Sequence, residues 1–530
     1  MLLLVFLVPI FAFTSDVLAA FGVSNVNGNY VIDAGSPEEL LVTVNGQSCD
    51  IQSILFLGNE LQSSTKGSHI ASGLGTATVT AETLQGSSNY VKVTCETPSL
   101  THFIVVREGE SKLYLSTYVT EEPSVGELRF IARLDSRLLP YEYPFGECST
   151  TADSDGTVEG SDVFVVDGET RSKFYSSERF IDDHVHCVHS DSLYACMLLP
   201  QKESSSGGPF FRDINSNNGG EMTALYFYMN SGHDQTEAYR MGLHGPYVLQ
   251  LSTDVPSFDD QDVSWYEEVG VTGFVPDSER GQVTGRASGI PDGFETVLHW
   301  KNDEAQYWTY ASPDGTFTSP LMKPGQYDMV LYQTEFAAAT SSVRVAAAAT
   351  TTADLASGIA PRDTVWQVGA WDGQPTRFGN AGRQLRMHPS DARMAPWAPA
   401  TYAVGASALD AVPMALFADL TSPLTVSFSL PADLGPATLR VGTTLSYAGA
   451  RPSVRVNDWQ GEDPPAAQKL DSRGVTRGAY RGFGEVYDFD VPSGVLVAGQ
   501  NTVSISALSG SSGSGFLSPN VVLDAIELFQ

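Results

Sequence analysis

The chain has 530 residues, of which 42% are hydrophobic and 17% are charged, a balance typical of globular proteins that excludes a disordered chain. Its 62 acidic residues against 30 basic ones give a formal net charge of −32, which repels nucleic-acid phosphate and anionic membranes. We therefore expect no nucleic acid and no membrane among its partners, and we expect a monomer. The abundance of glycine and proline, 49 and 29 residues, favours short strands joined by turns.

The N-terminus carries an apolar run from Met1 to Phe13, followed by the small-residue pattern Val17-Leu18-Ala19-Ala20. This pattern predicts a signal peptide over residues 1–20 and a secreted, extracellular protein. A signal anchor is the alternative, but Pro9 and Asp16 interrupt the run and leave it short of a membrane span.

All five cysteines lie in the first 200 residues, in agreement with an oxidising compartment and with disulfides only in the N-terminal part. Cys187 and Cys196 flank a segment of hairpin length, so they form the first expected disulfide. Cys49 with Cys95 is the second expected pair, which leaves Cys148 as an odd thiol.

Strand-like runs separated by turns, without long helical periodicity, predict an all-β protein of three β-sandwich modules in series. Residues 21–266 are expected to form one large sandwich. Residues 267–345, with Asp-Gly and Pro-Gly turns, have the size and pattern of a fibronectin type III-like sandwich. Residues 346–360 are rich in Ala and Thr and are interpreted as a linker. Residues 361–530 are predicted to form a jelly roll, a fold that often binds sugars.

Two tyrosines and a histidine form the first candidate site. In an extended strand Tyr226 and Tyr228 point to the same face, and His233 follows where that strand should end. Aromatic rings on one face suit a sugar ring, and a histidine beside them suits proton transfer. A surface-loop or capping histidine is the alternative, which the nearby Asp234 and Glu237 make less attractive.

Basic residues form two further candidates. Arg171 and Lys173 share a face if their segment is extended, and a lysine crowded by arginine has a lowered pKa that suits a base. The alternative is a solvated basic edge strand. Arg129 and Arg133 alternate with apolar residues on another strand, where they can clamp a uronate carboxylate or, equally well, form structural ion pairs.

Two clusters have the residue types of metal sites but not the spacing. Cys187 is better used in a disulfide than as a ligand beside His184, His186 and His189. The run Asp153-Ser154-Asp155-Gly156 lacks the spacing of an EF-hand because its glycine falls too early. We therefore expect no metal site.

Basic groups, a base and aromatic rings together favour β-elimination of a uronic acid over hydrolysis. Elimination removes the C5 proton next to the carboxylate, so the carboxylate must first be neutralised, by arginine, lysine or calcium. A glycosidase instead requires two opposed carboxylates, and no such pair is recognisable in the sequence.

Several segments together resemble the fungal rhamnogalacturonan lyases of polysaccharide lyase family 4. They are residues 168–177 around Lys173, Tyr226-x-Tyr228, Asn230-Ser231-Gly232-His233, residues 385–391 and residues 470–482. The likeness covers nearly the whole chain after the signal peptide. It implies a large mutarotase-like catalytic super-sandwich, a fibronectin type III-like module and a carbohydrate-binding-module-like jelly roll. Cys148 departs from the family pattern.

The resemblance also implies a mechanism. Lys173 and His233 would be the essential pair, with Lys173 as the base and His233 as the acid, or the reverse. Tyr226 and Tyr228 would line the groove, and Arg129 or Arg133 would hold the galacturonate. No cofactor would be required, and a structural calcium ion is not predicted.

The implied partner is rhamnogalacturonan I of plant cell-wall pectin. Its backbone would be cut between rhamnose and O4 of galacturonate, leaving an unsaturated galacturonate at the new non-reducing end. The alternatives are a non-catalytic secreted carbohydrate-binding protein and a glycoside hydrolase.

Overall fold

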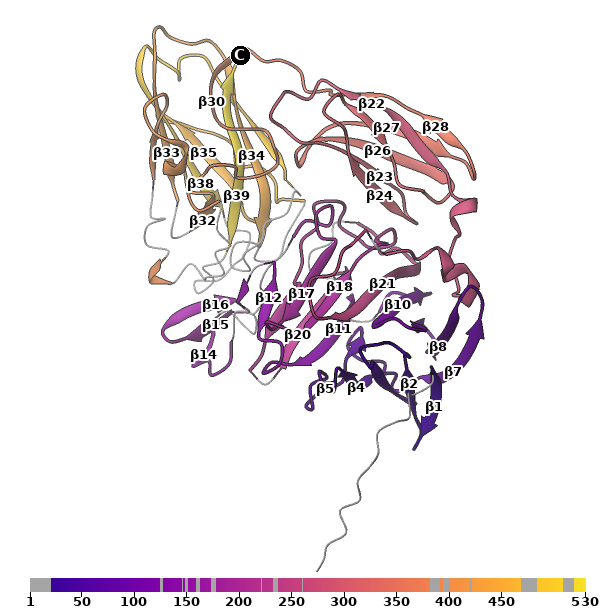
Figure 1. Ribbon diagram of the computed structural model, residues 1–530. Coiled ribbons are helices and arrows are strands. Elements are labelled where there is room, and N and C mark those ends of the chain that lie inside the picture. Colours follow the sequence, from indigo (N-terminus) through magenta and orange to yellow (C-terminus); the bar gives the residue numbers. More distant parts are fainter. Residues whose placement is uncertain are drawn as a thin grey trace, which may run out of the picture.

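The chain is built mainly from β-strands (Figure 1). The computed structural model describes residues 21–123, 127–144, 146–147, 151–158, 163–172, 178–220, 222–231, 237–259, 261–381, 391–393, 400–418, 422–468, 484–508 and 519–530. Helical structure in these ranges appears as short 3-10 turns, among them η1 (Ser264–Val269), η2 (Asp277–Glu279) and η4 (Leu409–Ala411). The predicted all-β fold is confirmed.

Three sheets of the first unit share one hydrophobic core, to which Val42, Leu225 and Leu249 each contribute from a different sheet. The nine-stranded sheet runs in the order β13 (Gly146–Glu147), β12 (Tyr141–Tyr143), β17 (Val185–His189), β18 (Tyr194–Leu198), β21 (Gly242–Ser252), β10 (Lys112–Val119), β9 (Leu100–Arg107), β8 (Asn89–Glu96), β7 (Thr78–Gln85). The four-stranded sheet runs in the order β19 (Ser216–Asn218), β20 (Met222–Asn230), β11 (Leu128–Asp135), β6 (His69–Ile70). The N-terminal sheet runs in the order β1 (Gly22–Val26), β2 (Asn29–Asp33), β3 (Leu41–Asn45), β4 (Ile51–Phe56), β5 (Asn59–Glu60).

A small three-stranded sheet stands apart at the side of this unit (Figure 1). It consists of β14 (Gly156–Val158), β15 (Val163–Val166) and β16 (Glu169–Ser172).

Both expected disulfides are present. Cys49 is bonded to Cys95, which ties the turn after β3 to β8, and Cys187 is bonded to Cys196. The second pair lies directly across the hairpin of β17 and β18. Cys148 lies outside the described residues.

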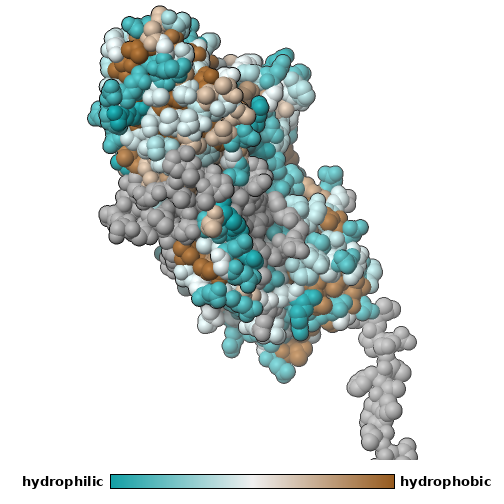
Figure 2. All heavy atoms as spheres, turned by 90° about the vertical axis from the view of Figure 1, so that its left-hand side faces the viewer, coloured by the Kyte–Doolittle hydropathy of each residue, from teal (hydrophilic) through white to brown (hydrophobic). Residues whose placement is uncertain are grey.

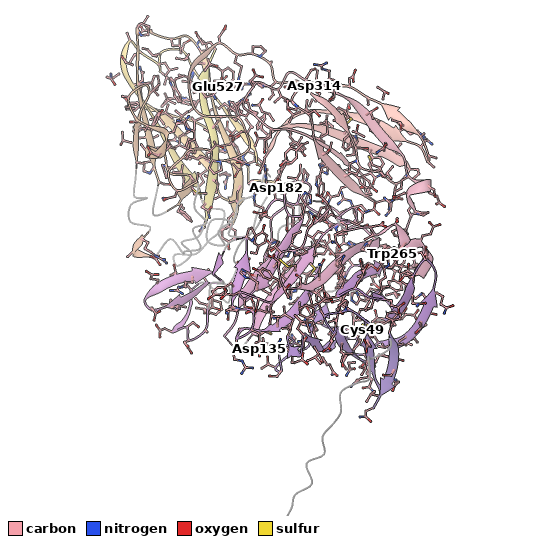
Figure 3. The ribbon with its side chains drawn as sticks, in the orientation of Figure 1. Cys49, Asp135, Asp182, Trp265, Asp314 and Glu527 are labelled. Atoms are coloured by element: carbon pink, nitrogen blue, oxygen red, sulfur yellow. A yellow bond between two sulfur atoms is a disulfide. The ribbon has the colours of Figure 1, made fainter. Side chains whose placement is uncertain are left out.

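The outer face of the nine-stranded sheet is covered by η1. Trp265 stacks on Tyr90 with ring centroids 4.8 Å apart and meets the ring of Tyr114 edge-on at 4.7 Å. Buried aromatic pairs of this kind stabilise beyond the area they bury. Residues just before the second unit therefore complete a second, smaller core of the first (Trp265 in Figure 3).

The second unit has two sheets around its own core. One runs β24 (Gln306–Tyr310), β23 (Thr296–Lys301), β26 (Gly325–Gln333), β27 (Phe336–Val345), and the other runs β25 (Thr316–Thr318), β22 (Gln282–Ser288), β28 (Thr350–Thr352), with β29 (Leu355–Ala356) also on β22. The interpretation of residues 346–360 as a linker is wrong for the part that forms β28 and β29, which pair in parallel with β22. Low sequence complexity did not prevent this, because threonine suits a strand and the edge of β22 offers free hydrogen-bonding groups.

The third unit is a sandwich of two five-stranded sheets around a separate core. One contains β30 (Thr364–Gly369), β39 (Asn520–Phe529), β34 (Ala437–Tyr447), β37 (Val486–Val491) and β32 (Ala415–Phe417). The other contains β31 (Thr401–Ala403), β33 (Leu424–Leu430), β38 (Gly499–Leu508), β35 (Arg451–Val456) and β36 (Trp459–Gln460).

The second and third units both stand on the first and touch each other (Figure 1). Between the first and second, Arg212 donates to Glu335 at 2.7 Å. Between the second and third, the Gln333 amide donates to the backbone oxygen of Trp371 at 2.8 Å. The modules are consecutive in sequence but form a triangle in space, so surfaces from different units face one another.

The face in Figure 2 mixes hydrophilic and hydrophobic residues, with brown spheres in small groups among teal and pale ones. Within the described ranges no helix combines the length and the apolar character that a bilayer crossing requires.

Candidate active site

Tyr226 and Tyr228 lie on one face of β20, as predicted, with ring centroids 5.6 Å apart and planes inclined by 28°. They are only 4% and 5% exposed, so they offer little open surface for stacking on a sugar. Burial raises the pKa of both hydroxyl groups, which therefore remain neutral. The tyrosines therefore supply the site with two fixed hydroxyl groups, not with an exposed aromatic surface.

Arg129 on β11 is directly opposite Tyr228 on β20. Its Nη1 donates to the Tyr228 hydroxyl at 3.0 Å, its guanidinium lies 5.5 Å from the centre of that ring, and it is paired with Glu127. Arg133, four residues further along β11 on the same face, lies close enough to Tyr226 for its charge to oppose the rise in the pKa of that hydroxyl. Each tyrosine thus has an arginine near it.

The two arginines differ in whether an acidic side chain balances their charge. Glu127 forms an ion pair with Arg129, whereas Arg133 has no ion pair to any residue in the described ranges. Within the same ranges the buried Nε–H of each arginine lacks a hydrogen-bond acceptor. These Nε–H groups are themselves closed to a ligand, but the Arg129 side chain keeps 22% of its surface exposed, so its guanidinium is the part that an anionic ligand can reach.

His69 extends this face across a third strand. Ile131 of β11 lies opposite Tyr226 on one side and opposite His69 of β6 on the other. Side chains at opposed positions project from the same face of a sheet, as do side chains two residues apart on one strand. We call this set the basic face; it consists of His69, Arg129, Arg133, Tyr226 and Tyr228, together with Lys66 from the segment before β6, which interacts electrostatically with both arginines.

The cations of the basic face lie close enough together to shift one another's pKa values. Burial, together with the charges of Arg133, Lys66 and Arg129, lowers the pKa of His69 to about 4. Burial and the two arginines also lower the pKa of Lys66. His69 is therefore neutral, with Nδ1 at 2.8 Å from the Gly67 carbonyl, while three cations surround it. Sequence reasoning missed His69 and Lys66, because only the pairing of β6 with β11 brings them to this face.

Lys173 and His233 lie outside the described residues, but the strands that lead to them are described. β16 ends at Ser172, and β20, which carries both tyrosines, ends at Asn230. Arg171, expected to share a face with Lys173, sits on β16 opposite Phe164.

The third unit holds the strand that precedes Lys173. The backbone N–H and the hydroxyl of Thr170 donate to Asp391 at 2.7 and 2.9 Å, and Arg393 donates to the Thr170 carbonyl at 2.8 Å. Hydrogen bonds from Arg393 and Thr170 keep the pKa of the Asp391 carboxyl well below its usual range. Residues more than two hundred positions apart thus position β16, which no local sequence signal could have indicated.

A buried ion pair between His186 and Asp183 contacts the backbone of Tyr226. His186 on β17 places Nδ1 at 2.8 Å from the Asp183 carboxylate and Nε2 at 2.7 Å from the backbone oxygen of Tyr226. Both partners are acceptors, so both ring nitrogens donate and the ring is an imidazolium. Burial alone would lower the pKa of His186, but the Asp183 charge outweighs it and the pKa is raised. His186, named from the sequence only as a member of a rejected metal cluster, connects the nine-stranded sheet to β20 at the candidate site.

The charge of His186 predicts a pH-dependent stability. A raised pKa in the folded state contributes stability below about pH 6.5 that is lost as the pH rises through the folded value. His186→Ala leaves Asp183 buried without its partner and should cost about 3–5 kcal/mol at pH 5.5. Urea unfolding at pH 5.5 and pH 9 should show this difference shrinking at the higher pH.

His189→Ala, on the same strand but half-buried, is the matched control; it removes a ring stack on Tyr194 and should cost only about 1 kcal/mol. Lys202, whose pKa burial lowers to about 8, interacts with the same Asp183 carboxylate, so its own titration also contributes to the difference at pH 9. A difference between wild type and His186→Ala that is equal at both pH values would mean that His186 is not charged.

Metal ligands are not grouped in the described part of the chain: it contains no cluster of three His, Cys, Asp or Glu residues suited to an ion. Three histidines that are close in sequence take part in different contacts. His184 lines a cavity, His186 forms an ion pair with Asp183, and His189 stacks on Tyr194.

Known protein families match almost the whole described chain. Residues 21–273 match the family described as rhamnogalacturonan lyase B, N-terminal, and residues 279–353 and 364–528 match domains II and III of polysaccharide lyase family 4. Rhamnogalacturonate lyase A of Aspergillus aculeatus is 57% identical over 521 residues, covering 98% of this chain and 98% of that protein. Rhamnogalacturonate lyase A of Emericella nidulans is 56% identical over 513 residues, covering 97% and 96%.

Proposed function

The chain belongs to polysaccharide lyase family 4, and from this membership we propose that it is a rhamnogalacturonan lyase that cleaves the backbone of rhamnogalacturonan I in pectin. The cut falls between rhamnose and O4 of galacturonate. The structural observation that carries the proposal is the basic face, which groups the cations Lys66, Arg129 and Arg133 inside a protein of net charge −32.

β-Elimination explains why such a face is needed. A base removes the C5 proton of galacturonate, the electron pair forms the C4–C5 double bond, and the C4–O4 bond breaks as the leaving oxygen takes a proton. Negative charge develops on the carboxylate during this step, so fixed cations beside it stabilise the transition state more than the ground state. Arg129 and Arg133 supply those cations, Lys173 the base, and His233 the acid, or the last two exchange roles.

Arg133 is the better candidate to hold the carboxylate directly. Arg129 shares its charge with Glu127, whereas the charge of Arg133 is uncommitted within the described ranges. Tyr228 orients the guanidinium of Arg129, and both tyrosines contribute neutral hydroxyl groups beside the two arginines.

The test is an assay for ultraviolet absorbance of the unsaturated product on debranched rhamnogalacturonan and, in parallel, on homogalacturonan. We expect absorbance to rise only with rhamnogalacturonan. New reducing ends without absorbance would indicate a hydrolase, and the absence of both would indicate a binding protein.

A chelator should leave this activity largely unchanged, because side-chain cations neutralise the uronate in the proposed mechanism. The measurement is the initial rate with excess EDTA and after restoring calcium. A large loss that calcium reverses would show that a metal ion performs the neutralisation.

We also propose that the protein is secreted after removal of residues 1–20 and acts as a monomer. The N-terminal sequence of the secreted protein and its mass in solution by light scattering test these two points.

A further inference from the structure

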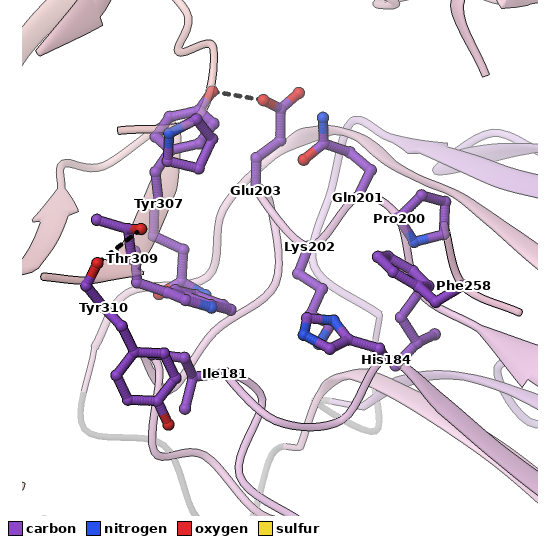
Figure 4. A pocket seen from close by; sticks show the side chains of 14 residues that line it. Ile181, His184, Pro200, Gln201, Lys202, Glu203, Phe258, Tyr307, Thr309 and Tyr310 are labelled. Atoms are coloured by element: carbon purple, nitrogen blue, oxygen red, sulfur yellow. Dashed lines mark hydrogen bonds between the residues drawn. The ribbon is translucent and has the colours of Figure 1, made fainter. Parts of the chain in front are cut away.

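A cavity of about 300 Å3 opens where the second unit meets the first (Figure 4). One wall comes from the segment just before β17 and from residues 199–203, just after β18. The other wall comes from β24. None of the residues placed in the catalytic machinery lines it. The volume is at the lower end of the range for small-ligand sites and is sufficient for one or two sugar rings.

Aromatic rings form much of the cavity wall. The rings of His184 and Phe258 stack with centroids 4.6 Å apart, and Trp308 lies against Phe180 at 6.2 Å. Tyr310 is 38% exposed. Rings at the edge of a polar opening are suited to the C–H faces of sugars, which combine apolar faces with a rim of hydroxyl groups.

One wall is fixed in place before any ligand arrives. The Tyr310 hydroxyl donates to Asp182 at 2.7 Å and accepts from Arg179 at 3.1 Å, and Arg179 also bonds Asp182 and Glu295 (Asp182 in Figure 3). These contacts join the two units across the cavity. A preorganised wall lowers the entropy lost on binding.

The ionic groups of the cavity are already used. Glu203 is paired with Arg280 at 2.7 Å and Lys323 at 3.1 Å and accepts from the Tyr307 hydroxyl. The ammonium of Lys202 donates to the backbone oxygens of Phe180 and Asp183. Glu203 is thus balanced by two cations, whereas Lys202 keeps its positive charge but is buried, which limits direct contact between its ammonium and a ligand.

The polar groups that remain are uncharged. In the described ranges neither the Gln201 amide nor the His184 ring has a hydrogen-bond partner, and burial and the charge of Lys202 lower the pKa of His184. A neutral imidazole and an amide each offer one donor group and one acceptor, which complements sugar hydroxyl groups. The charges that act on His184 are of both signs, with Lys202 positive and Asp183, Asp182 and Asp259 negative, so the cavity has no concentration of positive charge that would select an anion.

We propose that this cavity is a second, non-catalytic saccharide site that takes an uncharged sugar unit in preference to a uronate. On the substrate proposed above, the uncharged sugars of side chains fit this site, whereas the backbone galacturonates belong at the basic face. The site would hold a side chain while the backbone is cut.

The binding test uses saturation-transfer NMR on the full-length protein with β-1,4-galactotriose as the neutral probe and trigalacturonate as the acidic one. We expect millimolar binding of the neutral probe, as is usual for a few hydrogen bonds and one stacked ring, and at least tenfold weaker binding of the acidic one. Phe258→Ala and His184→Ala should each weaken galactotriose binding at least tenfold.

Tyr141→Ala is the matched control, because Tyr141 is a similarly exposed aromatic residue on β12 that does not line the cavity. It should leave galactotriose binding unchanged. With an expected dissociation constant of about 1 mM, galactotriose at about 20 mM should nearly saturate the site. The proposal is overturned if no binding is detected at that concentration. It is also overturned if binding survives both cavity variants or if trigalacturonate binds equally well.

Kinetics separates this site from the proposed activity. Phe258→Ala should raise KM severalfold on rhamnogalacturonan that carries galactan side chains and should leave kcat and KM on the debranched polymer unchanged. Equal effects on both polymers would overturn the side-chain site without touching the lyase proposal. The NMR measurement needs no turnover, so it stands even if the protein proves inactive on both.

Discussion

Lys173→Ala is expected to lower kcat on debranched rhamnogalacturonan by about 10²–10⁴-fold, the contribution typical of a positioned proton-transfer group. The C5 proton is only weakly acidic, so elimination is slow unless a base is held in reach of it. β16 ends directly before this lysine and is tied to the third unit by the contacts of Thr170 with Asp391. The measurement is the initial rate of ultraviolet absorbance at saturating substrate.

Lys301→Ala is a suitable control, because Lys301 is a half-buried lysine on β23 of the second unit. It should retain nearly full turnover. Lys173→Ala must also keep the thermal unfolding temperature of the wild type for the loss to count as chemical. Near-normal turnover in a folded Lys173→Ala protein would remove this lysine from the mechanism.

Arg133→Ala is expected to lower kcat/KM by about 10²–10³-fold, as is found when one preorganised donor to a developing anion is removed. Arg129→Ala should cost less, because Glu127 already offsets part of its charge. Arg133→Lys restores the charge but not the planar pair of donors, so it should recover only part of the activity.

The control for both arginines is Arg455→Ala, an exposed arginine of the third unit with 57% of its side chain accessible. It should behave like wild type. If Arg129→Ala proves the more damaging change, then Arg129 holds the uronate and Arg133 has the supporting role. If neither changes kcat/KM, the basic face is not where the carboxylate binds.

Features set by neighbouring residues were predictable. The hairpin spacing of Cys187 and Cys196 indicated their disulfide, and the alternation around Tyr226 and Tyr228 indicated that both project from one face. Strand periodicity is a local property, because successive side chains alternate between the two faces of any sheet. The all-β fold followed from the same kind of signal repeated along the chain.

Features set by distant residues were not predictable. The burial of β20 on both faces, and hence of its tyrosines, depends on neighbouring strands and segments that cover each side. The Ala- and Thr-rich stretch formed β28 and β29 only because β22 had an open edge to pair with. His186 was an unremarkable hairpin residue until the packing of two sheets placed it at the carbonyl of Tyr226.

The amino-acid sequence alone determined the class of fold, the residue types of the chemistry and the strands on which Arg129, Arg133 and the tyrosines lie, because each depends on short-range pattern. Three features were decided by the tertiary structure alone. His69 and Lys66 lie beside the two arginines, Glu127 forms an ion pair with Arg129 and not with Arg133, and a cavity opens between the first and second units. The reason is physical: the energy of charges, hydrogen bonds and buried surface depends on distances in space, which the order of residues along the chain does not specify.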